Sequence, residues 1–271
     1  CRIDLLIRRA CELRFPAIAL TDHGNMFGAI EFYQTAVKQG IKPVLGIEAY
    51  IASGSRFEKT AHGIRDASFH LTILVKDEQG YRNLMKLSTL SYLEGFYYKP
   101  RMDKEILRKY HGGLLALSGC LKGEVSHYIR NNQREDAVRA IQEYQDIFGK
   151  DDFFLEVYDH GLEEQKKVVE VIRELSKELK VPMVATNDVH YIYPTDYEAH
   201  DALLCIGTGA NISDTDRMRY ASNELYLKSA QEMIDRFKHI PGAIENTLAV
   251  TQKCNLELDF SKTFLPRFDP P

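Results

Sequence analysis

Side chains that commonly bind metal ions follow several short apolar runs of this sequence. They are Asp22, His23, Glu48, Cys120, Asp188 and His190. Imidazole, thiol and carboxylate groups supply the N, S and O donors that Zn, Mn and Fe bind, and they are costly in a dry core without metal or hydrogen-bond partners. Asp188 and His190 lie two positions apart, so their side chains point the same way if a strand continues through them. This spacing indicates a shared divalent-metal site.

Each of these residues also has a structural interpretation. Asp22 and His23 fit a helix N-cap with a hydrogen-bonded neighbour. Cys120 taken alone fits a small buried hydrophobe, and Glu48 fits a loop or helix-dipole partner. Recurrence at successive strand ends favours one shared site, but the spacing leaves both interpretations open.

These side chains need a scaffold that brings the ends of distant segments together. Apolar runs predict buried strands at residues 17–20, 43–50, 71–75, 114–117, 153–157 and 181–185. Helical patterns separate them, most clearly at 3–13, 137–148 and 168–179. Alternating strands and helices predict an α/β fold with a parallel sheet covered on both faces, either a barrel or an open doubly wound sheet. In both, polar residues collect where strands end at their carboxyl side.

The last part of the chain has a different pattern. From Tyr193 onward the alternation stops, and helical patterns occur at 196–206, 230–237 and 242–254. The proline-rich segment 265–271 predicts a linker into a further domain. The predicted organisation is therefore an α/β unit, either barrel or open sheet, over 1–192 and a helical extension with a linker over 193–271.

Composition narrows the class of protein. The 271 residues are 44% hydrophobic and 27% charged, which is enough for one substantial globular core. The net charge of −4 argues against a broad cationic nucleic-acid surface, so any DNA contact should be local or supplied by a larger protein. Five widely spaced cysteines fit neither a disulfide framework nor a zinc finger. Without a membrane-spanning run or a signal-peptide pattern, the expected location is the cytoplasm.

Many blocks of the sequence, in the same order, are similar to a known family. The clearest are 21–25 (TDHGN), 40–48 (GIKPVLGIE), 69–74 (FHLTIL), 95–101 (GFYYKPR), 117–120 (LSGC), 187–191 (NDVHY), 199–204 (AHDALL) and 225–229 (LYLKS). They resemble the polymerase and histidinol phosphatase (PHP) domain of the bacterial DNA polymerase III alpha subunit. The resemblance covers the whole chain, including blocks outside the expected site.

The resemblance implies a distorted (β/α)₇ barrel of the PHP type, with a helical C-terminal extension and a metal cluster at the carboxyl ends of the strands. The positions that match family metal ligands are His23, Glu48, His70, Cys120, Asp188 and His190. Asp22 would orient these ligands. His70 enters only through the resemblance, because it precedes its apolar run. No catalytic group is assigned.

The resemblance also implies an activity and partners. Divalent ions, Zn or Mn here and Mg in the parent polymerase, would support phosphoester hydrolysis, such as a 3′-to-5′ exonuclease. The parent would be a DNA-directed DNA polymerase of replication, a nucleotidyltransferase that binds DNA and holds its palm domain in cis beyond Pro271. The alternative is a metal-stabilised structural module that docks a separate proofreading exonuclease. A histidinol-phosphate phosphatase is a third possibility, which the matching blocks after Tyr193 disfavour.

One family motif is missing. The family opens with His-x-His on its first strand, and this sequence contains no such motif, so Cys1 is expected to lie just downstream of it. The expectation is that this chain, without that strand, binds metal weakly and hydrolyses little.

Other residues have weaker assignments. His160 follows a predicted strand and fits a position at the rim, whereas His200 fits helix packing. The remaining histidines, His62, His111, His127 and His239, are not assigned to a metal. The aromatic and basic segment 96–101 fits either a platform for single-stranded nucleic acid or a buried loop.

Overall fold

The computed structural model describes residues 1–60, 68–261 and 265. Its strands are β1 (Ala17–Leu20), β2 (Lys42–Ile51), β3 (Phe69–Val75), β4 (Arg101–Met102), β5 (Leu114–Leu117), β6 (Phe153–Val157) and β7 (Met183–Ala185). They form one sheet in the order β1-β2-β3-β5-β6-β7, with β4 paired to the far end of β2. The predicted strands are confirmed, and β4 is an additional short one.

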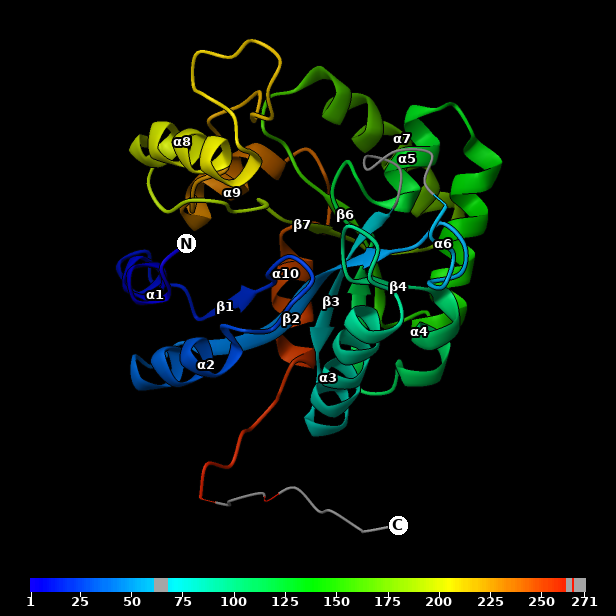
Figure 1. The fold of residues 1–271 in the computed structure, drawn as a ribbon, viewed down its shortest axis with the longest axis horizontal. Coiled ribbons are helices and arrows are strands. Elements are labelled where there is room, and N and C mark those ends of the chain that lie inside the picture. The colour runs from blue at the N-terminus through cyan, green and yellow to red at the C-terminus, as the bar shows by residue number, and fades with distance from the viewer. Residues whose placement is uncertain (61–67, 262–264, 266–271) are drawn as a thin grey trace.

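Helices surround this curled sheet (Figure 1). Those of the first part are α1 (Ile3–Glu12), α2 (Ala29–Lys38), α3 (Glu78–Leu93), α4 (Lys104–Tyr110), α5 (Glu124–Arg130), α6 (Arg134–Phe148) and α7 (Glu163–Leu179). Those of the last part are a 3₁₀ turn at Pro194–Asp196, α8 (Tyr197–Thr208), α9 (Ala230–Phe237) and α10 (Glu245–Lys253). The α/β class with a helical C-terminal part is confirmed. Within the described part of the chain β1 and β7 do not pair, so the sheet is an open half-barrel.

One strand departs from the expected parallel order. β3 runs antiparallel to both β2 and β5, whereas β1–β2, β2–β4, β5–β6 and β6–β7 are parallel. Because β3 is reversed, its amino end lies at the same rim as the carboxyl ends of its neighbours. The prediction of an all-parallel sheet was wrong, since an apolar run does not encode strand direction.

Side chains alternate between the two faces of the sheet, as the strand period of two requires. One face packs against the outer helices through residues such as Leu45, Ile73 and Phe153. The opposite face has a separate apolar layer: Val44, Leu74, Leu115, Leu117, Phe154 and Val184, closed by Val250 of α10 and by Cys254, which directly follows this helix. The inside of the half-barrel is therefore packed with apolar side chains at one end, and polar side chains can occupy the other end.

The C-terminal helices return to the sheet. Asn246 in α10 donates a hydrogen bond to the main-chain oxygen of Met183 in β7 (2.7 Å), and Ala185 N donates to Ala243 O (2.9 Å). In Figure 1, α10 lies beside β2 and β7. The helical part thus completes the core of the half-barrel. The predicted proline-rich linker falls on 265–271, of which only Leu265 is among the described residues. No helix in the described ranges combines the length and the apolar character needed to span a bilayer.

Candidate metal centre

The polar end of the half-barrel gathers residues from distant parts of the sequence. Glu48 in β2, His70 at the start of β3 and Cys120 after β5 place an oxygen, a nitrogen and a sulfur atom within 4.8 Å of one another. Oε1 of Glu48 contacts Nδ1 of His70, and Sγ of Cys120 lies 3.5 Å from the same nitrogen. Glu48 and His70 are buried, with 7% and 8% of their surface exposed, so this triad forms the floor of the centre.

His23 forms one wall of the centre. It sits in the loop after β1 and pairs with Glu48 through a parallel bridge, and Gly24 N donates to Glu48 O (2.9 Å). Nδ1 of His23 lies 3.3 Å from Oε1 of Glu48, and 47% of its side chain is exposed. The carboxylate therefore faces two imidazoles, one buried and one on the open side.

His190 and Asp188 approach from the loop after β7. The His190 ring lies 5.6 Å from the His23 ring, and Oδ1 of Asp188 is 3.6 Å from Nδ1 of His190. His190 Nδ1 donates to the main-chain oxygen of Asp188 (2.7 Å), because a carbonyl oxygen can only accept. In the neutral ring Nε2 then carries the lone pair, which accepts a hydrogen bond from the hydroxyl of Tyr220 (2.7 Å). Asp188 has a left-handed backbone (φ 46°), a strained conformation of the kind found at binding sites.

The charges of these groups depend on one another. Burial alone would raise the pKa of Glu48, but hydrogen bonds and attraction from His23 and His70 outweigh it and lower this pKa. The hydrogen bond to Glu48 raises the pKa of His23. Burial, together with repulsion from Glu48 and Asp188, raises the pKa of the Cys120 thiol. The centre therefore attracts positive charge, and a cation bound there would favour the thiolate.

Comparison with known proteins fits this arrangement. The family model described as PHP domain matches residues 1–160. The chain belongs to the PHP family. It is 44% identical over 269 residues to the DNA polymerase III subunit alpha of Treponema pallidum, across 99% of this chain and 23% of that protein. It is 45% identical over 271 residues to the same subunit of Borreliella burgdorferi, across 100% of this chain and 24% of that protein.

This PHP chain therefore spans about a quarter of the length of the curated relatives that it matches. Two solved structures superpose on part of this chain. One is an amidohydrolase from Chromobacterium violaceum, with a TM-score of 0.39 and 14% identity over 68% of this chain and 79% of that one. The other is described as a metal-dependent phosphoesterase from Bifidobacterium adolescentis, with a TM-score of 0.41 and 13% identity over 86% of this chain and 90% of that one.

The triad of this PHP domain suits a divalent cation. A buried carboxylate oxygen, an imidazole nitrogen and a sulfur atom converge there, and no described lysine or arginine forms an ion pair with the carboxylate. Such mixed O, N and S donors fit Zn²⁺ and related ions. Among the described residues, no hydrogen bond or ion pair joins the Asp22 side chain to this triad. Its main-chain oxygen accepts from Glu48 N (3.0 Å), so an orienting role for its carboxylate stays a prediction.

A buried carboxylate that the sequence did not single out, Glu156, lies next to the Cys120 loop. Glu156 in β6 accepts hydrogen bonds from Thr186 Oγ1 (2.6 Å), Gly119 N (3.0 Å) and Thr72 Oγ1 (3.2 Å). Burial raises the pKa of Glu156 to about 7. The hydrogen bond from Thr186 acts in the opposite direction but is weaker, and repulsion from Asp188 raises the pKa further. A single carboxylate inside the apolar run 153–157 was the available signal, because strands buried on both faces rarely hold an unpaired charge.

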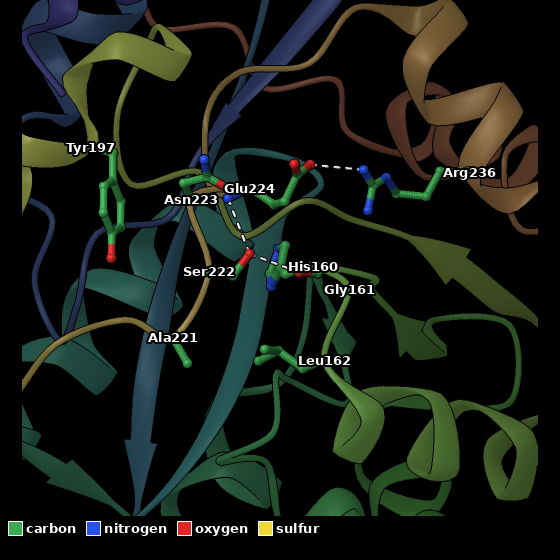
Figure 2. A pocket seen from close by; sticks show the side chains of 9 residues that line it. All are labelled: His160, Gly161, Leu162, Tyr197, Ala221, Ser222, Asn223, Glu224 and Arg236. Carbon is green, nitrogen blue, oxygen red and sulfur yellow. Dashed lines mark hydrogen bonds and ion pairs between the residues drawn. The ribbon is translucent and has the colours of Figure 1, made fainter.

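His160 reaches the rim but is not one of the converging donors. Its Nε2 donates to Asn187 O (2.9 Å), and Gln165 Nε2 donates to its Nδ1 (2.9 Å), so both ring nitrogens are satisfied. Figure 2 shows it lining a cavity of about 520 Å³ with residues 221–224 and Arg236. His160 therefore supports the loop that carries Asp188 and His190.

The other histidines are distributed as follows. His200 packs against Tyr220 (5.6 Å between ring centroids) and His190 (5.7 Å), in agreement with the predicted packing role. The three unassigned histidines that the structure describes, His111, His127 and His239, lie at the end of α4, in α5 and near α9. His62 lies outside the described residues.

Cys120 owes its position to a tight turn. Gly119 has a left-handed backbone (φ 83°), and a Cβ there would collide with the main-chain oxygen of His70. The same glycine donates its N–H to Glu156. A side chain at this position would push the Cys120 loop away from β3.

We expect Gly119→Ala to destabilise the domain and to impair metal binding. Gly40→Ala is the matched control, because Gly40 also has a left-handed backbone (φ 73°) but open space around its would-be Cβ. Both changes carry backbone strain of about 1–2 kcal/mol, and overpacking at Gly119 should add about 1–3 kcal/mol. Denaturant unfolding of both variants measures the difference. Equal losses would show that the turn tolerates the extra methyl group.

Proposed function

We propose that this chain is the PHP domain of a bacterial replicative DNA polymerase, and that it holds divalent ions which support phosphoester hydrolysis at DNA 3′ ends. The observation that carries the proposal is the buried triad of Glu48, His70 and Cys120, in a chain closely related to DNA polymerase III alpha subunits. His23, Asp188 and His190 surround this triad and are proposed to complete the ligand set. Zn²⁺ fits the mixed O, N and S donors best, and Mn²⁺ is the second candidate, since it prefers the oxygen and nitrogen donors of the set.

In such a reaction the ion and the residues of the chain would have different tasks. A bound divalent ion lowers the pKa of a water molecule and stabilises charge on a phosphoryl group. Glu48 and His70 hold their positions by burial, whereas the exposed ring of His23 marks the side from which a substrate approaches. The hydroxyl of Tyr220 donates to Nε2 of His190, and it would be released to donate to a phosphate oxygen only when an ion takes that nitrogen.

The wider context is also a proposal. Residues 1–192 would form the barrel and residues 193–271 the helical extension that leads toward a polymerase palm domain in cis. Template-directed nucleotide transfer, with Mg²⁺, would belong to that palm domain, and DNA would be the shared substrate. A replicative polymerase works in the cytoplasm, where a proofreading exonuclease subunit is a possible partner.

The test measures nucleotide release by the purified chain. We expect slow, metal-dependent release of mononucleotides from a 3′-labelled single-stranded oligonucleotide in Mn²⁺ or Zn²⁺, and none with a chelator. His190→Ala serves as the contamination control, because a co-purifying nuclease would not respond to it. A chain that binds metal and never releases nucleotides, even within the longer polypeptide, would instead support a structural role.

A further inference from the structure

The end of α3 and the loop that joins it to β4 present aromatic side chains to solvent. Tyr92, Phe96 and Tyr98 are 39%, 49% and 53% exposed. Tyr92 and Phe96 stack with ring centroids 6.1 Å apart. We call residues 92–100 the aromatic arm. Aromatic rings that stay exposed to water contribute little hydrophobic stabilisation to the fold, so core packing does not account for the arm.

Buried groups hold the arm in place. Arg101, 5% exposed, donates hydrogen bonds from its guanidinium to the main-chain oxygens of Gly95 (3.1 Å) and Glu58 (2.7 Å). A Cβ at Gly95 would collide with the main-chain oxygen of Arg101. At the tip, Tyr97 N donates to Lys99 O (3.0 Å), and Tyr98 has a left-handed backbone (φ 58°). The exposed rings therefore project from a well-supported turn.

The arm adjoins the metal centre. Nζ of Lys99 lies 5.5 Å from the centroid of the Tyr50 ring, which in turn lies 5.2 Å from the His70 ring. Pro100 packs over the loop that carries His23, since a Cβ at Gly24 would lie 2.9 Å from its Cγ. A molecule that contacts the arm is thus within one or two side chains of the proposed metal ligands.

Two exposed lysines lie near the centre. Lys99 belongs to the arm, and Lys122 follows Cys120, where its main-chain oxygen accepts from His70 N (3.0 Å) and its charge opposes the rise in the pKa of His23. Neither ammonium pairs with a carboxylate among the residues that the structure describes. In a chain of net charge −4, a local pair of free cations beside exposed rings fits a ligand that is both anionic and aromatic.

We propose that the aromatic arm binds single-stranded nucleic acid and leads its end into the metal centre, with bases on Phe96 and Tyr98 and phosphates at Lys99 and Lys122. The part of this inference in which the strand end enters the metal centre rests on the proposed function. The part in which the arm binds single strands does not. Unpaired bases expose the faces that stack on aromatic rings, whereas bases in a duplex are already stacked. The arm should therefore prefer single strands.

The experiment measures the fluorescence anisotropy of a labelled oligothymidylate titrated with the full chain in chelator, so that hydrolysis cannot interfere. We expect Tyr98→Ala to weaken binding about fivefold or more, the effect of losing one stacked base. Phe260→Ala is the matched control, because Phe260 is also 50% exposed and its ring lies 6.0 Å from that of Tyr33 in α2, which is not part of the arm. Thermal melts verify that each variant is folded.

Salt dependence tests the phosphate contact separately. Lys99→Met should lower the slope of log affinity against log salt by about 0.7, the value for one phosphate contact on a single strand. Lys177→Met, on the exposed face of α7, should leave the slope unchanged. A duplex of the same sequence should bind more weakly and should not respond to Tyr98→Ala.

Several results would overturn the inference. They are no binding of the oligonucleotide by the unaltered chain, equal affinities after Tyr98→Ala and Lys99→Met, or a preference for duplex. Nucleotide release is a separate measurement. A chain that binds single strands through the arm but never cleaves them would refute the hydrolytic function alone.

Discussion

Glu48→Gln is expected to remove most of the divalent-metal binding of this domain and, with it, any metal-dependent hydrolysis. Glu48 is the residue that both His23 and His70 face, and its negative charge is held ionised by their contacts. Glutamine keeps the shape but removes the charge and one acceptor oxygen. Loss of a supporting group alone typically costs about 10 to 100-fold in metal affinity, so loss of this central carboxylate should cost at least about 100-fold.

Metal titration by calorimetry and thermal unfolding with and without Mn²⁺ provide two independent readouts. An ion at about 100 times its Kd stabilises the folded state by about 2.7 kcal/mol, and this increment should disappear in Glu48→Gln. Glu257→Gln, at an exposed carboxylate after α10, should retain it. Undiminished metal binding by Glu48→Gln would exclude the triad as the centre of the site.

Glu156→Gln is expected to stabilise the domain above neutral pH, measured in chelator. Burial raises the pKa of Glu156 from 4.5 to about 7. The folded state therefore holds this proton more tightly than the unfolded state, and stability is lost as pH rises from about 4.5 through 7. A shift of this size corresponds to on the order of 3 kcal/mol at pH 8, which an uncharged side chain would avoid.

Glutamine can keep the hydrogen bonds of Glu156. Its carbonyl oxygen can accept from Gly119 N and Thr72, while its amide nitrogen faces the hydroxyl of Thr186, which can turn to accept. The measurement is the difference in unfolding free energy between variant and unaltered chain at pH 5 and pH 8. We expect a small difference at pH 5 and a large one at pH 8. A difference independent of pH would mean that the folded state does not raise the pKa of this carboxyl above its unfolded value.

The sequence by itself determined most of the secondary structure and part of the site. Continuous apolar runs marked six strands of the sheet, and the helical periodicity of 137–148 and 168–179 lies within α6 and α7. The sequence also put His23, Cys120 and Asp188 after strands, where the structure has them. These inferences succeeded because each buried position of a strand or helix requires an apolar residue, so the spacing of apolar residues in the sequence indicates the element.

Only the tertiary structure decided the direction of each strand and the face of the sheet on which each side chain lies. His70 stands at the start of its strand, and it joins Glu48 and Cys120 because β3 runs antiparallel and brings that start to the common rim. Likewise, Glu156 lies below the centre because the two-residue alternation of β6 directs it to the inner face, beside Thr72 of β3 and Thr186 after β7. Both placements depend on pairing between strands distant in sequence, and the energy of such pairing belongs to the assembled sheet, not to any one segment.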